Sequence, residues 1–162
     1  FKCTKGWGKA SLHEGGIRLP FIITCGSHLT PGKSNHAGQF VDIMPTFAEL
    51  AGVEAPANDG ISLVPTLTGG EQPKHEYLYW EFPGGKGWVA VRWGEWKGIV
   101  KNVHKGNNVM ELYDLHTDLR ETTDVAAQYP EVVEQMWKFI KESHQPVPND
   151  VQRYKMTINF PE

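Results

Sequence analysis

The chain has 162 residues, of which 40% are hydrophobic, 11% aromatic and 22% charged, and its formal net charge at pH 7 is −3. This length favours one domain or two small ones, and the apolar content excludes a disordered tail. Two cysteines are too few for a disulfide framework, and no apolar run reaches the ~18 residues of a membrane span. Residues 1–41 carry five basic residues and one acidic one, whereas the rest carries 11 basic and 18 acidic residues. This balance favours a small anion as the partner and argues against nucleic acid.

The N-terminal region is predicted to contain a loop followed by a strand. Residues 1–13 are rich in Gly and Lys and show no periodicity, as is typical of a loop. The apolar run Phe21-Ile22-Ile23 comes directly after Pro20 and predicts a strand buried on both faces of a parallel or mixed sheet. Because the sequence starts with Phe1 and not with Met, we expect a processed product, an engineered piece or a fragment.

Two helices are predicted next. Over residues 42–51, apolar side chains recur with helical spacing, Asp42 is a candidate N-cap, and Pro45 lies in the first turn. Gly52 suits the position that follows the last helical residue. A one-turn helix is predicted over residues 63–67.

From Tyr77 onward the pattern alternates with a period of two residues, which is typical of strands. Short turns between these strands predict an antiparallel sheet, with strands over residues 77–82, 89–93, 96–101 and 111–115. A further amphipathic helix is predicted over residues 130–143, with Pro130 in the first turn. Residues 146–162 are rich in proline and are predicted to be an extended tail.

Chemistry-bearing residues are sparse. The seven histidines show no HExxH pattern and no tight spacing with the cysteines, so a complete zinc site is not indicated, and GxSxG and P-loop motifs are absent. The best candidate site is the run Lys9, His13-Glu14-Gly15-Gly16 and Arg18, in which glycines permit close backbone approach and the cations can hold an anion. The alternative is a surface lysine beside a glycine turn, with a local ion pair between Glu14 and Arg18. His28 and His36, in a polar stretch, are interpreted as solvated.

These residues resemble a known family. The stretch GKASLHEGGIRLP (residues 8–20) is similar to the K-x-x-x-(Y/H)-E-G-G-x-R-x-P segment of the sulfatases, members of the alkaline phosphatase superfamily. VDIMPTFAELAG (residues 41–52) resembles the family's D-(I/L)-x-P-T-x-x-x-L-A-G helix. YLYWEF, AVRWGEWKGI and ELYDLHTDLRETTDVA resemble its C-terminal sheet and its closing E-L-Y-D-L-x-x-D-x-x-E segment. The resemblance covers about residues 6–143 in the family's order.

The resemblance implies sulfate-ester hydrolysis. In the family, a formylglycine made from Cys or Ser in a (C/S)-x-P-x-R motif attacks sulfur, and a divalent cation, usually Ca²⁺, neutralises the sulfate together with Lys, Arg and His side chains. No Cys or Ser of this chain has Pro at +2 and Arg at +4. The family's metal ligands lie upstream of the segment matched by residues 8–20. We therefore expect a C-terminal portion that binds no metal and is inactive alone.

The resemblance also assigns roles to the candidate site. Lys9 corresponds to the family lysine that contacts a sulfate or leaving-group oxygen and is the candidate catalytic residue. Glu14, Gly15, Gly16 and Arg18 are interpreted as architecture that directs the Lys9 loop. His13 stands where the family often has Tyr; it is interpreted as packing or pocket rim, with substrate binding as the alternative. The aromatic residues of the strands are interpreted as core, and the Gly-rich loop over residues 82–88 as a candidate substrate rim.

The expected fold class is α/β, or α+β for the piece alone. Residues 1–70 would be the C-terminal end of a large α/β domain, residues 71–145 an antiparallel-sheet subdomain with a covering helix, and residues 146–162 the tail. Expected partners are a sulfated sugar or aryl sulfate and the family's N-terminal domain, with no nucleic acid or membrane. Without that domain, the predicted strand at 21–23 and the helix at 42–51 would expose apolar surface and favour self-association.

The family resemblance implies an extracytoplasmic location, which is periplasmic, secreted or lysosomal. Two alternatives remain open at this point. The first is a phosphate- or phosphonate-ester hydrolase of the same superfamily. The second is a stand-alone module for anionic glycans that uses Lys9, Arg18 and exposed Trp side chains.

Overall fold

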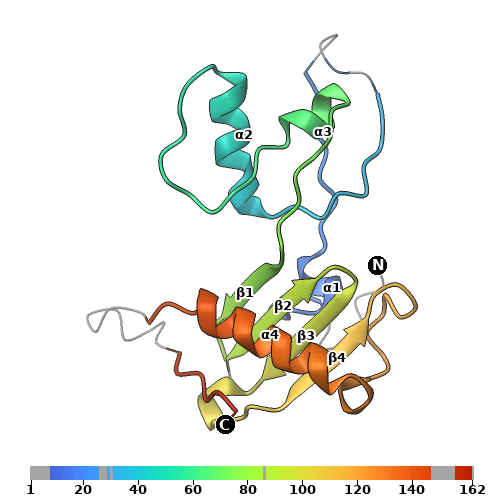
Figure 1. Ribbon diagram of the computed structural model, residues 1–162, viewed down its shortest axis with the longest axis vertical. Helices are drawn as coiled ribbons and strands as arrows, with labels where there is room; N and C mark the ends of the chain where they lie inside the picture. Colours follow the sequence, from blue (N-terminus) through green and yellow to red (C-terminus); the bar gives the residue numbers. More distant parts are fainter. Residues whose placement is uncertain (1–7, 26–28, 30, 86, 147–155, 162) are drawn as a thin grey trace. The chain divides into compact units, whose positions relative to one another are not determined.

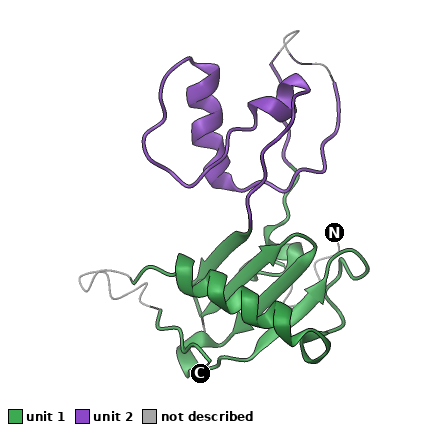
Figure 2. Cartoon of the chain, in the orientation of Figure 1, with its two compact units in different colours: residues 1–20, 77–162 green, residues 21–76 purple. Residues whose placement is uncertain are grey.

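The computed structural model describes residues 8–25, 29, 31–85, 87–146 and 156–161. The chain divides into two compact units, one made of residues 1–20 and 77–162 and the other of residues 21–76 (Figure 2). We call them the sheet unit and the helical unit. Residues 1–20 therefore fall in the same unit as the sheet. The expected division into residues 1–70, 71–145 and 146–162 stays a prediction.

The sheet unit contains four antiparallel strands in the order β1-β2-β3-β4 (Figure 1). They are β1 (Leu78–Phe82), β2 (Trp88–Trp93), β3 (Trp96–Lys101) and β4 (Met110–Asp114). The predicted antiparallel sheet is confirmed. A two-residue turn joins β2 to β3, where Trp93 pairs with Trp96 and Gly94 adopts a φ of +58°. Tight hairpins of this kind require positive φ, which glycine adopts without steric cost.

Helix α4 (Pro130–Ser143) has the predicted bounds and covers one face of the sheet (Figure 1). Its Met136 and Ile140 are fully buried against strand residues such as Val91 and Leu112. A Cβ added to Gly98 of β3 would lie 2.6 Å from the Met136 sulfur. Helix α4 and β3 therefore pack so closely at this point that only glycine fits without a shift of that side chain. Residues 156–161 form no helix or strand, as expected for the tail, but Met156 and Ile158 are buried in this core.

The other face of the sheet is covered by the N-terminal segment. Leu12 packs against Ala90, Ile99 and Tyr113, and a short helix, α1 (Glu14–Ile17), follows. The aromatic side chains of the strands pack against these two cores, so their predicted core role is confirmed: Tyr79, Trp93 and Trp96 against the α4 side, and Trp80, Phe82 and Trp88 against the N-terminal side. Two 3₁₀ helices, η3 (Val103–Lys105) and η4 (Ala126–Gln128), complete the described connections.

The helical unit contains η2 (Phe40–Asp42), α2 (Ile43–Leu50) and α3 (Val64–Thr68), which confirms both predicted helices. Gly52, with a φ of +68°, follows α2 as predicted. The expected N-capping by Asp42 is wrong, because its side chain makes no capping bond to α2. Its two carboxylate oxygens instead accept the N–H groups of Gln39 (2.7 Å) and Ile61 (2.8 Å).

The predicted strand over residues 21–23 is wrong. These residues form no strand in the structure, and the side chains of Phe21 and Ile22 are 61% and 86% exposed. A buried strand needs hydrogen-bonded neighbours on its edges. Among the described residues, every strand pairing lies within β1 to β4, so this segment has no neighbour with which to pair.

Candidate functional site

Lys9 lies in a tight turn at the start of the described chain. The Ser11 N–H donates to the Gly8 carbonyl at 3.1 Å, and Ala10 has a φ of +67°. A positive φ at the third residue is the signature of a type II turn, which places Lys9 at the second position. The Lys9 side chain is exposed there.

Helix α1 supports this turn through Gly16. A Cβ on Gly16 would lie 2.2 Å from the Ser11 carbonyl oxygen and 2.7 Å from that of Gly8, so no other residue fits without moving the turn. The Gly16 N–H donates to the His13 carbonyl at 2.8 Å. Gly15 is the second residue of α1 and is half-buried.

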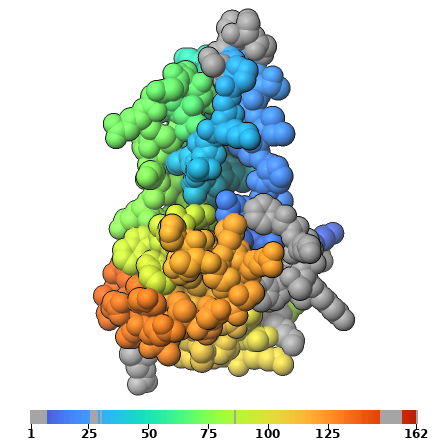
Figure 3. All heavy atoms as spheres, turned by 90° about the vertical axis from the view of Figure 1, so that its right-hand side faces the viewer, coloured from blue at the N-terminus to red at the C-terminus, as the bar shows by residue number. Residues whose placement is uncertain are grey.

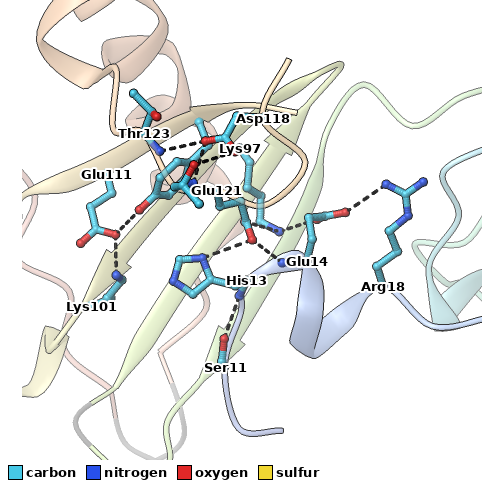
Figure 4. Close-up of polar contacts among 12 residues, drawn as sticks. Ser11, His13, Glu14, Arg18, Lys97, Lys101, Glu111, Asp118, Glu121 and Thr123 are labelled. Atoms are coloured by element: carbon cyan, nitrogen blue, oxygen red, sulfur yellow. Dashed lines mark hydrogen bonds and ion pairs between the residues drawn. The ribbon is translucent and has the colours of Figure 1, made fainter. Parts of the chain in front are cut away.

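Glu14 is buried in an ionic cluster rather than exposed beside Lys9 (Figure 4). One carboxylate oxygen lies 2.8 Å from Nζ of Lys97, a residue of β3 whose side chain has no solvent exposure. The other lies 3.7 Å from Nη1 of Arg18, which is the local ion pair anticipated as an alternative from the sequence. The backbone N–H of Glu14 donates to Oε2 of Glu121 at 2.7 Å.

Lys97 and Glu121 were missed by sequence reasoning. Burial lowers the pKa of Lys97, and the nearby carboxylates of Glu14 and Glu121 oppose this shift. The Lys97 ammonium also lies 5.0 Å from the centre of the Trp80 ring, a cation–π contact. The available signal for Lys97 was the two-residue period of β3, which puts it on the same face as the buried Ile99.

Glu121 lies in the loop that follows β4. This loop belongs to the part of the sheet unit that is orange in Figure 3. Its φ is +53°, unusual for a residue with a side chain, and its side chain is 1% exposed. The Glu121 N–H donates to the Asp118 carbonyl at 3.0 Å. The Asp118 carboxylate accepts the N–H groups of Thr122 and Thr123 at 2.6 and 2.8 Å, which fixes the loop locally (Figure 4).

His13 is buried, with 1% of its side chain exposed. Its Nδ1 lies 3.3 Å from Oε2 of Glu121, and its ring meets Trp88 and Tyr113 edge-on at centroid distances of 5.6 and 5.8 Å. In this arrangement His13 is part of the packing beneath the Lys9 turn.

The other histidines and the cysteines do not gather into a site within the described residues, where no group of three His, Cys, Asp or Glu side chains is placed to hold a metal ion. Cys25 is exposed and free, whereas Cys3 and His28 lie outside the described residues. His36, expected to be solvated, is half-buried: its Nε2 is buried, and burial lowers its pKa. Lys86 of the predicted rim loop is not described; Pro83 in that loop accepts a hydrogen bond from His104 at 2.8 Å.

The chain is similar in sequence and in structure to known sulfatases. The bovine (Bos taurus) arylsulfatase A is 37% identical over 95 residues, which is 56% of this chain and 19% of the relative. A choline-sulfatase of Rhizobium meliloti is 33% identical over 127 residues, 74% of this chain and 23% of the relative. A solved 2-O GAG sulfatase superposes with a TM-score of 0.55 at 27% identity, covering 73% of this chain and 27% of that one.

This chain thus spans about a quarter or less of the length of those relatives. None of its described helices is long and apolar enough to cross a membrane. The family described as "N-sulphoglucosamine sulphohydrolase, C-terminal" matches residues 5–146, nearly the whole chain. The chain belongs to this family of C-terminal sulfatase domains.

Proposed function

We propose that this chain acts as the C-terminal part of a sulfatase and supplies Lys9 to the pocket that binds the sulfate ester. The observation that carries the proposal is the exposed ammonium of Lys9, held at the corner of a turn that α1 supports through Gly16. The family match provides the reaction class, sulfate-ester hydrolysis.

The chemistry proposed for Lys9 is electrostatic. Cleavage of a sulfate ester places negative charge on the leaving oxygen and on the sulfate oxygens. An ammonium that donates a hydrogen bond to one of these oxygens stabilises that charge, and it contributes most when it is held in place before the reaction. Glu14 does not neutralise Lys9 in this arrangement, because its carboxylate is engaged by Lys97 and Arg18.

The residues present do not fit the family's formylglycine and Ca²⁺. No Cys or Ser is followed by Pro at +2 and Arg at +4. Among the residues that the structure describes, no acidic cluster is placed for a cation. We therefore assign no step of the reaction to these groups in this chain, and the purified chain should not hydrolyse an aryl sulfate.

For the substrate, we propose a sulfated sugar, with an aryl sulfate as the second class to test. A relative from Bacteroides thetaiotaomicron, an N-acetylglucosamine-6-O-sulfatase, is 29% identical over 168 residues. A solved relative in complex with D-glucosamine-2-N,6-O-disulfate superposes with a TM-score of 0.51 at 26% identity. An extracytoplasmic location is part of the same proposal.

The partner that we propose is the preceding region of the sulfatase polypeptide. In the helical unit, Phe40, Phe47 and Leu50 are 87%, 63% and 56% exposed. They belong to an apolar surface around α2, and an open groove of about 590 Å³ there is lined by Phe40, Val41, Ile43, Met44, Phe47, Asn58 and Asp59. Exposed apolar area of this kind supports an interface with that preceding region.

The test uses the longer sulfatase that contains this chain. Lys9→Ala should lower kcat/KM for its sulfate ester by about 10²-fold or more, comparable to the loss of one preorganised oxyanion donor. Lys33→Ala, which removes another exposed lysine, is the matched control and should leave kcat/KM unchanged. Unchanged kinetics for Lys9→Ala would remove Lys9 from the site. Faster hydrolysis of the matching phosphate or phosphonate ester would overturn the sulfatase assignment.

A further inference from the structure

We propose that Glu121, together with Lys97, is the positioning residue that fixes the Lys9 turn on the sheet. The proposal rests on the proposed function for the role of Lys9, but the contacts that carry it are independent of any reaction. Glu121 and Lys97 act on Lys9 in two steps. They bind Glu14, the first residue of α1. Gly16 of the same helix then packs against the turn that carries Lys9.

The turn itself is anchored to α1. Because the backbone of Gly16 lies against the carbonyl oxygens of Ser11 and Gly8, the turn cannot shift unless α1 shifts with it. The His13 N–H also donates to the Ser11 hydroxyl at 3.1 Å, and Ser11 is 5% exposed. The place of Lys9 is therefore determined by the place of α1.

Helix α1 has four residues and cannot hold a position by itself, because a single turn is far below the length at which an isolated helix is stable. Its first residue, Glu14, is held through both its backbone and its side chain. The Glu14 N–H donates to Glu121 at 2.7 Å, and the Glu14 carboxylate binds Lys97 at 2.8 Å. In Figure 4 these side chains converge from α1, β3 and the loop after β4.

The Glu121 carboxylate is also close to His13 and Lys97. Its Oε2 lies 3.3 Å from Nδ1 of His13, and its Oε1 lies 4.0 Å from Nζ of Lys97. One carboxylate thus contacts the two residues that start α1 and the strand lysine beneath them. The positive φ of Glu121 persists in a residue with a side chain because its surroundings determine it, as expected where a side chain must be directed to one place.

The first experiment uses the chain as it is and measures amide hydrogen exchange by mass spectrometry. In Glu121→Ala, residues 8–17 should exchange about tenfold faster or more, because a charge-assisted hydrogen bond is lost. Protection of β2 and β3 should change much less. Glu121→Gln keeps an acceptor for the Glu14 N–H and should restore part of the protection. Glu134→Gln, which alters an exposed ion pair on α4, is the control and should leave residues 8–17 unchanged.

Two results would overturn the proposal: unchanged exchange of residues 8–17 in Glu121→Ala, or an equal rise there and in β2 and β3. If Glu121→Ala does not fold, Glu121→Gln gives the same test at smaller amplitude. In the longer sulfatase, a residue that acts only through Lys9 has no effect once Lys9 is gone. As a single substitution, Glu121→Ala should therefore lower kcat. When it is added to Lys9→Ala, it should lower kcat no further. If Lys9→Ala itself leaves kcat unchanged while the exchange result holds, the proposed function fails and the positioning contact stands.

Discussion

The substitution Glu14→Gln should destabilise the sheet unit by about 3–5 kcal/mol, because it breaks a buried ion pair and leaves one charge behind. The Lys97 ammonium and the Glu14 carboxylate lie 2.8 Å apart, with side-chain exposures of 0% and 4%. The other carboxylate near Lys97 among the described residues, that of Glu121, is 4.0 Å away. A loss of this size is a large part of the roughly 5–15 kcal/mol that stabilises a typical domain.

The defect should depend on pH. Burial holds the pKa of Lys97 below its ordinary value of 10.5, and Glu14 opposes that shift, so its removal lowers the pKa further. Between the folded-state pKa and 10.5, the unfolded chain binds more protons at Lys97 than the folded chain does, and stability rises with pH. Because the folded-state pKa of Lys97 is lower in the variant, the pH range in which stability rises begins at a lower pH there. The stability difference between Glu14→Gln and wild type should therefore narrow as pH rises from neutral toward 10.5.

Urea unfolding followed by tryptophan fluorescence measures these energies, since the chain has six tryptophans. In the double variant with Lys97→Met, the buried charge is gone, so the loss should be at least ~1 kcal/mol smaller than the sum of the single losses. Glu134→Gln removes an ion pair of the same 2.8 Å length whose side chains are 57% and 70% exposed, and it should change stability by less than about 0.5 kcal/mol. Additive single effects, or a Glu14→Gln variant as stable as this control, would refute the reasoning.

Three further perturbations test the turn and the apolar surface. Gly16→Ala should cost about 1–3 kcal/mol in urea unfolding, because its Cβ would overlap the Ser11 carbonyl, whereas Gly70→Ala meets its nearest atoms at 3.6 Å and should be close to neutral. Ala10 has a φ of +67°, so Ala10→Val should lower stability by about 1–2 kcal/mol, whereas Ala10→Gly should not lower it. Thermal unfolding of the two variants measures this difference. Light scattering should show concentration-dependent self-association of the chain, reduced by Phe47→Asp at a 63% exposed position; a monomeric wild type would contradict the proposed interface.

The antiparallel sheet and its covering helix were predictable because their signals are local. Alternating side chains specify a strand over five or six residues, and the Gly94 hairpin turn connects two of them without any distant information. The same holds for α4, whose apolar face recurs with helical spacing and whose first residue is Pro130. The apolar run at residues 21–23 also has a local pattern that favours a strand, but a strand needs an edge with which to pair, and its own sequence cannot provide one.

The ionic cluster was not predictable from local pattern, because its members are far apart in sequence. Glu14 and Lys97 are 83 residues apart, and Glu14 and Glu121 are 107 residues apart. A lysine in an alternating strand is ordinarily interpreted as facing solvent, and it does so unless another segment covers that face. Lys97 is buried because Glu14 of the N-terminal segment and Glu121 of the loop after β4 lie against it.

The two faces of the sheet differ in what they specify. The face under α4 is apolar, and hydrophobic burial there is non-directional, so it stabilises the unit without fixing the exact place of any one loop. The face under the N-terminal segment holds buried charges, and these stabilise only the arrangement in which each charge finds its partner. The buried charges can therefore determine where one exposed ammonium lies. Catalysis by a preorganised charge requires this kind of placement. If Lys9 has the role proposed for it, the buried Glu14 supports the Lys9 turn and is not a second charged group at the substrate.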